Sequence, residues 1–316
     1  MAGAHTDHTE TIGKVTLNHD YYHGSDEYSD GDETENLLLD IVTNHPESEY
    51  PQIIIEKASW PVLYHLSPLR ETLLSWIPFQ KGEKILELGS GCGAVTGAFL
   101  HKGLSVTAVD LSLRRSRINA TRHRDAEELT IYLGASEEVL PNLTEKFDHA
   151  TLIGVLEYAE AFSKEEKPFH YILNSIRSVL KDDGSLWVAI ENKLGLKYFA
   201  GCKEDHTGRY FEGIEDYPHN EGPRTFSKKE LTKLAEECGF ICEFYYPYPD
   251  YKLPVKVFSD EYLPQKGELS RNWQNFDADR LLLFDETKAF DTILDAGLFP
   301  EFSNSFLVRM RKKVQP

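Results

Sequence analysis

Short apolar runs alternate with amphipathic segments from Lys84 onward, and this alternation constrains the fold more than any other feature of the sequence. Segments such as AVTGAFLHKG and SKKELTKLAEECG predict helices, because each ends at a glycine and the second begins at a serine that can cap it. Strands that alternate with helices imply a parallel sheet covered on both faces, and right-handed crossovers then give a doubly wound fold. We therefore expect an α/β fold with a mostly parallel, seven-stranded sheet, whose strands are EKILEL, SVTAVD, LTIYL, DHATLIG, SLWVAIE, FICEFYYPY and FSNSFLVRM.

The segments around these strands suggest a division of the chain into five parts. Residues 1–32 are polar and acidic, and we expect a flexible N-terminus there. Residues 33–80 carry helical patterns and are expected to form a helical N-terminal cap. The core follows at 81–246, an inserted lid or substrate region at 247–302, and the last core strand with a basic tail at 303–316.

The composition limits the classes of binding partner and the cellular location that we expect for the protein. The 316 residues carry a formal net charge of -18, and a field of that sign opposes approach to nucleic-acid phosphates and anionic lipid. The sequence contains no apolar run of the roughly 20 residues that cross a bilayer, and its start lacks the pattern of a targeting segment. We expect a cytoplasmic protein. No CxxC pairing is present, so we expect no metal site and no disulfide framework from Cys92, Cys202, Cys238 and Cys242.

The first expected strand ends in the turn Glu87-Leu-Gly-Ser-Gly-Cys-Gly93, whose glycines let the backbone approach a ligand. Ligands of such sheets bind outside the carboxyl ends of the strands. Asp110 ends the second strand about 20 residues further on, where a carboxylate can accept hydrogen bonds from both hydroxyls of a ribose. A nicotinamide-binding fold shares these features, but its fingerprint is GxGxxG, whereas this turn is GxGxG. A glycine-rich turn without a ligand is the other alternative.

With VTAVD after the turn and FDHATLIGVLEY at the fourth strand, residues 84–191 resemble class I S-adenosylmethionine-dependent methyltransferases, which have a Rossmann-like core. The resemblance implies S-adenosyl-L-methionine as cofactor and S-adenosyl-L-homocysteine as product. It implies that Glu87 orients the turn or meets the amino group, that Asp110 holds the ribose and that Leu111 packs against adenine. Ala135 stands where many members have an Asp, so backbone groups or Ser136 would reach the adenine amine. Further cofactor contacts are expected from Gly89, Ser90, Gly91, Gly93, Gly154 and Val155.

A narrower resemblance covers most of the chain. Segments such as WPVLYHLSPLRE, ENKLGLKYFAG and EDHTGRYFEGIEDYP are similar to a bacterial group of these enzymes that is associated with surface-polysaccharide or glycan assembly. It implies transfer of a methyl group to a hydroxyl of a sugar, glycan precursor or other small molecule. The alternatives are a nucleic-acid or protein methyltransferase and a non-catalytic, cofactor-binding partner of a glycan-assembly enzyme. The oligomeric state stays open.

The segment 192–224 has no helical or alternating pattern and leaves the fifth strand at its carboxyl end. Long loops of this kind are usually functional, although a structural flap is the alternative. A hydroxyl must lose its proton during methyl transfer, and a histidine can accept it. We expect His206 to act as the base with Asp205 orienting its ring. Glu191 is the competing base, and Glu157 with Tyr158 is the third choice.

Two basic features have both a functional and a structural interpretation. Arg70 is expected to pair with the methionine carboxylate, with Tyr64 closing the same pocket, or else to form an ordinary surface ion pair. The second helix carries a run of cations that can touch an anionic substrate or nucleic acid, although a solvated helix face is the favoured interpretation. The run comprises Arg114, Arg115, Arg117, Arg122, His123 and Arg124.

Overall fold

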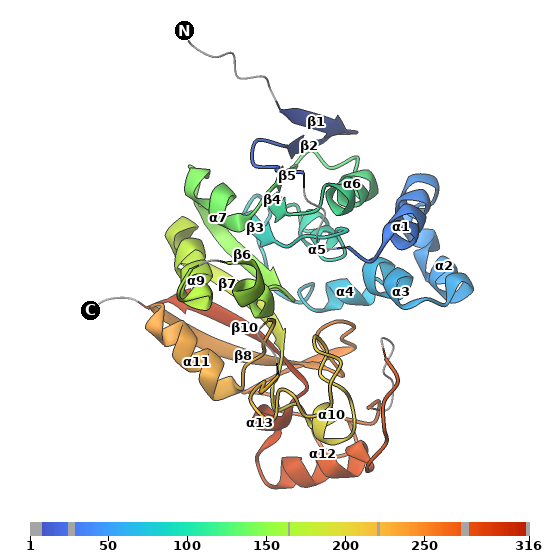
Figure 1. The fold of residues 1–316 in the computed structure, drawn as a ribbon, viewed down its shortest axis with the longest axis vertical. Coiled ribbons are helices and arrows are strands. Elements are labelled where there is room, and N and C mark those ends of the chain that lie inside the picture. Colours follow the sequence, from blue (N-terminus) through green and yellow to red (C-terminus); the bar gives the residue numbers. More distant parts are fainter. Residues whose placement is uncertain (1–7, 25–28, 164, 220–221, 273–277, 314–316) are drawn as a thin grey trace. The chain divides into compact units, whose positions relative to one another are not determined.

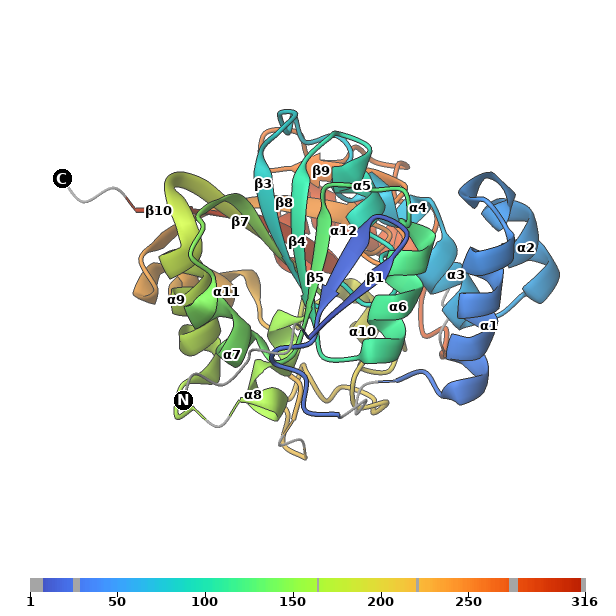
Figure 2. The ribbon, with the colours of Figure 1, turned by 90° about the horizontal axis from the view of Figure 1, so that it is seen from above.

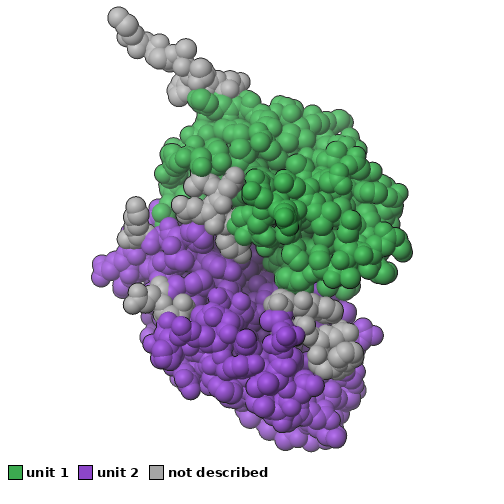
Figure 3. Space-filling model, turned by 45° about the vertical axis from the view of Figure 1, so that its right-hand side comes forward, with its two compact units in different colours: residues 1–150 green, residues 151–316 purple. Residues whose placement is uncertain are grey.

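The computed structural model describes residues 8–24, 29–163, 165–219, 222–272 and 278–313. It divides the chain into two compact units, 1–150 and 151–316, which Figure 3 shows in different colours. The division does not follow the five parts expected from the sequence, which remain a prediction. Each unit is described separately below.

Unit 1 is built on five strands in the order β1-β2-β5-β4-β3. The strands pair in parallel as β3–β4, β4–β5 and β2–β5. They contribute the buried core residues Ile85, Val106, Ala108 and Ile131. Figures 1 and 2 show β3, β4 and β5 side by side, and α5, α6 and α7 contact β4. The strands are β1 (Thr9–Ile12), β2 (Val15–Asn18), β3 (Lys84–Leu88), β4 (Ser105–Asp110) and β5 (Leu129–Leu133).

The helices of unit 1 fall into two groups, one before β3 and one between or after the strands. Those before β3 include α1, which packs on α6 through Leu38 and Ile118. The bounds are α1 (Asp32–Asn44), η1 (Glu47–Glu49), α2 (Tyr50–Lys57), α3 (Trp60–Leu66), α4 (Leu69–Thr72), α5 (Thr96–Leu100), α6 (Leu113–Arg122), α7 (Ser136–Val139) and η2 (Leu140–Asn142).

Unit 2 contains the strand order β7-β10-β8-β9, and every pair in it is antiparallel. β6 (Phe147–Ile153) runs across the boundary between the units. The remaining elements are η3 (Leu156–Tyr158), α8 (Ala159–Phe162), α9 (Pro168–Val179), β7 (Leu180–Glu191), α10 (Leu196–Phe199), α11 (Lys228–Glu237), β8 (Phe240–Tyr248), β9 (Lys256–Ser259), α12 (Glu286–Asp295), α13 (Phe299–Phe302) and β10 (Ser305–Lys312). Among the helices described, none combines the length and apolar character that a membrane span requires.

Two expectations need correction. All seven predicted strands are present, but the described residues contain ten strands with mixed pairing, so the mostly parallel, seven-stranded sheet is wrong in number and in character. The N-terminus is not simply flexible over 1–32, because β1 and β2 form a hairpin there, with Gly13 at the turn (φ 61°). Val15 and Leu17 are fully buried. Strands of four residues carry too little alternation to be recognised, and tertiary burial decides their structure.

Candidate active site

The glycine turn of unit 1 joins β3 to α5 and has left-handed backbone at all three glycines. Their φ angles are 68° at Gly89, 51° at Gly91 and 77° at Gly93, a region that side chains disfavour. A Cβ on Gly93 would lie 2.4 Å from Asn119 Oδ1, whereas a Cβ on Gly91 would meet nothing within 4 Å. Gly93 is therefore packed against α6, while the space at Gly91 is open to a ligand.

Asp110, at the end of β4, closes this turn. Its Oδ2 accepts a hydrogen bond from Gly91 N (2.7 Å), and its Oδ1 accepts one from Ser112 N (2.9 Å). A carboxylate oxygen accepts up to two hydrogen bonds, so these contacts are compatible with the expected ribose contact. Ser90 adds a polar group to the turn: its side chain is 7% exposed and its Oγ has no hydrogen-bond partner in the described residues.

A network of buried polar side chains packs against the turn. Thr96 donates to Glu87 Oε2 (2.6 Å), Asn119 donates to Thr96 (3.2 Å), and His123 Nε2 lies 3.1 Å from Gly93 O. Burial raises the pKa of Glu87 to about 8, and burial together with Arg122 lowers the pKa of His123 to about 4. Glu87 is thus held by Thr96 at the start of α5, and its expected role in orienting the turn or meeting the amino group stays a prediction. Asn119 and His123 were missed as site residues, although their spacing of four on α6 places them on one helix face.

Other expected cofactor residues of unit 1 have clear positions. Arg70 is 4% exposed, lies 4.3 Å from the centre of the Tyr64 ring and donates to the Tyr64 hydroxyl (3.3 Å), so the two residues do come together. Leu111 follows β4, and Ala135 and Ser136 follow β5. A Cβ on the preceding Gly134 would lie 2.7 Å from Tyr21 O, which shows that the N-terminal segment covers this strand end. Tyr21 is a neighbour that sequence reasoning did not identify.

The basic run on α6 is not an open cationic face. Arg115 is 6% exposed and pairs with Glu35 (3.0 Å) and Asp30 (2.7 Å). Three other arginines of the run also form ion pairs within the unit: Arg114 with Asp32, Arg117 with Glu10 and Arg122 with Glu47. Both the solvated-face interpretation and the anion-binding alternative therefore fail at Arg115, which is a buried structural group.

Unit 2 gathers three side chains that the sequence placed far apart. Glu157 lies in η3, Glu191 is the last residue of β7, and His206 lies in the loop 192–224. His206 Nε2 is 3.6 Å from Glu157 Oε1 and 4.0 Å from Glu191 Oε2. Glu157 and Glu191 are 1% and 0% exposed, and burial raises the pKa of Glu191. The structure thus brings together the first-choice, second-choice and third-choice bases of the sequence analysis. Gly154 and Val155 follow β6 in the same unit.

Glu204, rather than Asp205, orients the His206 ring. Glu204 Oε1 lies 2.9 Å from His206 Nδ1, and its Oε2 accepts hydrogen bonds from the backbone of His206 (2.9 Å) and Thr207 (2.7 Å). Burial disfavours the imidazolium, but Glu157 and Glu204 outweigh it and raise the pKa of His206 to about 11. His206 therefore holds its proton at neutral pH, and the prediction that it accepts the proton of a hydroxyl is not supported by its surroundings.

Asp205 belongs to a separate network of lysines. Its carboxylate lies 3.0 Å from Lys197 Nζ and 2.5 Å from Lys252 Nζ, and it accepts a hydrogen bond from the Tyr198 hydroxyl (2.5 Å). Burial alone would raise the pKa of Asp205, but the two ammonium groups hold it well below its usual value. The expected pairing of Asp205 with His206 is wrong, because the backbone turn at Glu204 points the adjacent side chain elsewhere.

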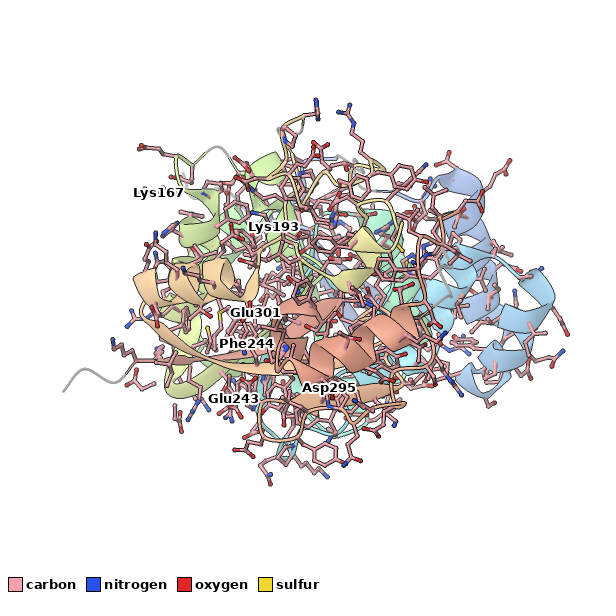
Figure 4. All side chains as sticks on the ribbon, turned by 90° about the horizontal axis from the view of Figure 1, so that it is seen from below. Lys167, Lys193, Glu243, Phe244, Asp295 and Glu301 are labelled. Atoms are coloured by element: carbon pink, nitrogen blue, oxygen red, sulfur yellow. The ribbon has the colours of Figure 1, made fainter. Side chains whose placement is uncertain are left out.

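The loop 192–224 is fastened to its own unit. Lys193, labelled in Figure 4, lies 2.7 Å from Asp216 and 2.8 Å from Glu230. Tyr217 donates to Glu204 (3.3 Å) and shares a hydrogen bond with Thr225 (2.7 Å). The described part of the loop is therefore an ordered structure that positions His206.

Residues 86–186 match the family described as "Methyltransferase domain". Residues 86–186 are thus similar to a methyltransferase domain. The glycine turn, Asp110, Ala135 and Glu157 all lie within the matched residues, whereas Glu191 and His206 lie beyond them.

Similar proteins of known name include two ubiquinone biosynthesis O-methyltransferases. That of Glaesserella parasuis is 29% identical over 37% of this chain and 49% of its own length. That of Pasteurella multocida is 28% identical over 42% of this chain and 56% of its own length. The chain thus spans about half the length of these curated relatives. A solved S-adenosylmethionine-dependent methyltransferase from Archaeoglobus fulgidus is 12% identical and covers 77% of this chain and 93% of its own, with a TM-score of 0.47.

Proposed function

We propose that this chain transfers the methyl group of S-adenosylmethionine to a hydroxyl oxygen of a small molecule and releases S-adenosylhomocysteine. The observation that carries the proposal is the glycine turn closed by Asp110, inside the residues matched to the methyltransferase domain. The backbone of Gly89, Gly91 and Gly93 and the hydroxyl of Ser90 would line the methionine part of the cofactor. Asp110 would hold the ribose, Leu111 the adenine, and Arg70 with Tyr64 the carboxylate.

We propose that the cluster of Glu157, Glu191 and His206 removes the proton that the acceptor hydroxyl loses during methyl transfer. Methyl transfer to a hydroxyl needs a base, since the sulfonium cannot remove the proton. Glu191 is the proposed base, because neither of its carboxylate oxygens has a hydrogen-bond partner in the described residues and burial makes its carboxylate more basic. His206 holds its own proton, so its role is to position and balance the carboxylates.

The acceptor we propose is a sugar, a glycan precursor or another small hydroxylated molecule. The net charge of -18 and the internal ion pairs of the α6 arginines both disfavour a nucleic-acid acceptor. The curated relatives are named O-methyltransferases, which supports oxygen as the atom that receives the methyl group.

The test is incubation of the full chain with methyl-labelled S-adenosylmethionine and a panel of nucleotide sugars, glycan fragments and phenols, followed by mass analysis. A product heavier by one methyl group at an oxygen supports the proposal. Cofactor binding without transfer to any acceptor would favour the non-catalytic alternative. Transfer to RNA or to a protein in preference to every small molecule would contradict the proposed acceptor.

A further inference from the structure

The cluster of Glu157, Glu191 and His206 has the composition and spacing of a cation site. One ligand atom from each residue lies within 4.8 Å of the other two, and the pairs that involve His206 Nε2 are 3.6 and 4.0 Å apart. Ligands bound to one ion at about 2.0–2.2 Å are roughly 3–4.2 Å from one another. The cluster therefore needs little contraction to hold an ion.

The carboxylates have oxygens that nothing in the described residues satisfies. Glu157 Oε2 and Glu191 Oε2 are buried without a hydrogen-bond partner, in side chains that are 1% and 0% exposed. Glu191 Oε1 lies 3.0 Å from Lys252 Nζ, but this ion pair does not have the geometry of a hydrogen bond. Because buried carboxylates are costly unless they are paired or bind a metal, these oxygens are candidate ligands for a cation.

The imidazole is held in the way that metal-bound histidines are held. A histidine that binds a metal through one nitrogen usually donates its other N–H to a carboxylate, which fixes the tautomer and the ring. Glu204 lies 2.9 Å from Nδ1 of His206 and is itself fixed by two backbone amides. The other nitrogen, Nε2, faces Glu157 and Glu191.

We propose that Glu157, Glu191 and His206 bind one divalent cation through one oxygen of each carboxylate and Nε2 of the imidazole, with Glu204 orienting the ring. The ion displaces the proton that Nε2 holds in the metal-free protein, and this proton is released to solvent. Mixed carboxylate and imidazole ligands suit Mn²⁺ and Zn²⁺ better than Mg²⁺, which prefers oxygen alone. Lys252, which Asp205 and Glu191 share as an ion-pair partner, neutralises part of the remaining carboxylate charge. Three protein ligands leave coordination positions open.

The use of this ion rests on the proposed function. An acceptor oxygen that takes an open position would lose its proton more readily, and the second oxygen of Glu191 would accept that proton. Binding of the ion itself is independent of methyl transfer, so the two proposals can be tested separately.

The test is titration of the chelator-treated full chain with Mn²⁺, Zn²⁺ and Mg²⁺, with bound Mn²⁺ followed by electron paramagnetic resonance. The wild type should bind one ion, with Mn²⁺ or Zn²⁺ tighter than Mg²⁺. Glu157→Gln and Glu191→Gln should each weaken binding at least about tenfold, and Glu204→Gln about 10–100-fold. Glu212→Gln is the matched control, because Glu212 is a buried carboxylate (3% exposed) that holds His219 outside the cluster.

Saturable binding that Glu212→Gln weakens as much as Glu191→Gln would place the ion elsewhere and overturn the proposal. So would the absence of saturable binding by wild-type protein whose thermal unfolding is cooperative. Ion binding without methyl transfer would leave the cation site standing and count against the proposed function. Methyl transfer at full rate by metal-free protein would support the proposed function and overturn the proposed use of the ion.

Discussion

The glycine turn of unit 1 and the carboxylate–histidine cluster of unit 2 are made in different ways. The turn presents backbone amides, and its shape depends on three left-handed glycines and one carboxylate, Asp110. The cluster presents charged side chains from three separate segments, and its shape depends on hydrogen bonds that the carboxylate of Glu204 accepts from His206. The turn should therefore be sensitive to added atoms, and the cluster to removed charge.

The largest effect is expected from removing charge in the cluster. Glu191→Gln should reduce turnover by about 10²–10⁴-fold, the usual contribution of a positioned base. Steady-state kinetics with the identified acceptor measures it, and Glu212→Gln is again the matched control. Turnover within about threefold of wild type would remove Glu191 from the chemistry.

The next prediction tests whether Asp205 acts in the lysine network and not in the cluster. Asp205→Asn removes the buried carboxylate that Lys197 and Lys252 share, and breaking such a pair costs about 3–5 kcal/mol of the free energy of unfolding. Asp216→Asn, which alters the pair between Lys193 and a carboxylate that is 69% exposed, should cost at most about 1 kcal/mol. Denaturant unfolding measures both. Equal, small losses would show that the lysine network is not structural.

Two glycine substitutions distinguish the glycine of the turn that is packed against α6 from the one that borders open space. Gly93→Ala should lower the melting temperature clearly, because its Cβ would collide with Asn119 Oδ1 at 2.4 Å in a left-handed backbone. Gly91→Ala should lower it less, because its Cβ enters open space, and should act mainly on cofactor affinity. The pair is measured by thermal unfolding and by calorimetric titration with S-adenosylhomocysteine. The opposite order of melting temperatures would contradict the geometry of the turn.

The last of these effects is a pH dependence at Glu87. Its folded pKa is raised from 4.5 to about 8, so the folded state binds a proton that the unfolded state releases between these values. The stabilisation is fully present below about pH 4.5 and is lost as the pH rises through 8. Glu87→Gln should lack this loss, so its melting temperature relative to wild type should rise from pH 5 to pH 8. A constant difference across that range would mean that Glu87 is ionised in the folded protein.

The glycine turn and the cluster also differ in how well the sequence predicts them. The seven long strands and the glycine turn depend on neighbouring residues, so EKILELGSGCG and VTAVD were sufficient to place Gly89, Gly91 and Asp110. The hairpin at Thr9–Asn18 was missed because its strands are short and gain their stability from burial in the rest of unit 1.

The cluster was only partly predictable for a different reason. His206, Glu191 and Glu157 were each identified, but as competing bases, because sequence distance hides that they meet. Asp205 was preferred to Glu204 as the partner of His206 because it is adjacent, whereas the loop turns so that Glu204 faces the ring. The expectation of no metal rested on cysteine spacing, which carries no information about a site made of carboxylates and one imidazole.

The central claim is that unit 1 holds the cofactor through the turn and Asp110, while the cluster of unit 2 serves the acceptor. Calorimetric titration of Asp110→Ala and Glu191→Gln with S-adenosylmethionine tests it most directly. Charge-assisted hydrogen bonds are worth about 1.5–3 kcal/mol each, so Asp110→Ala should weaken binding at least about tenfold, and Glu191→Gln should leave it unchanged. Unchanged affinity in a folded Asp110→Ala variant, or a tenfold loss in Glu191→Gln, would contradict the account.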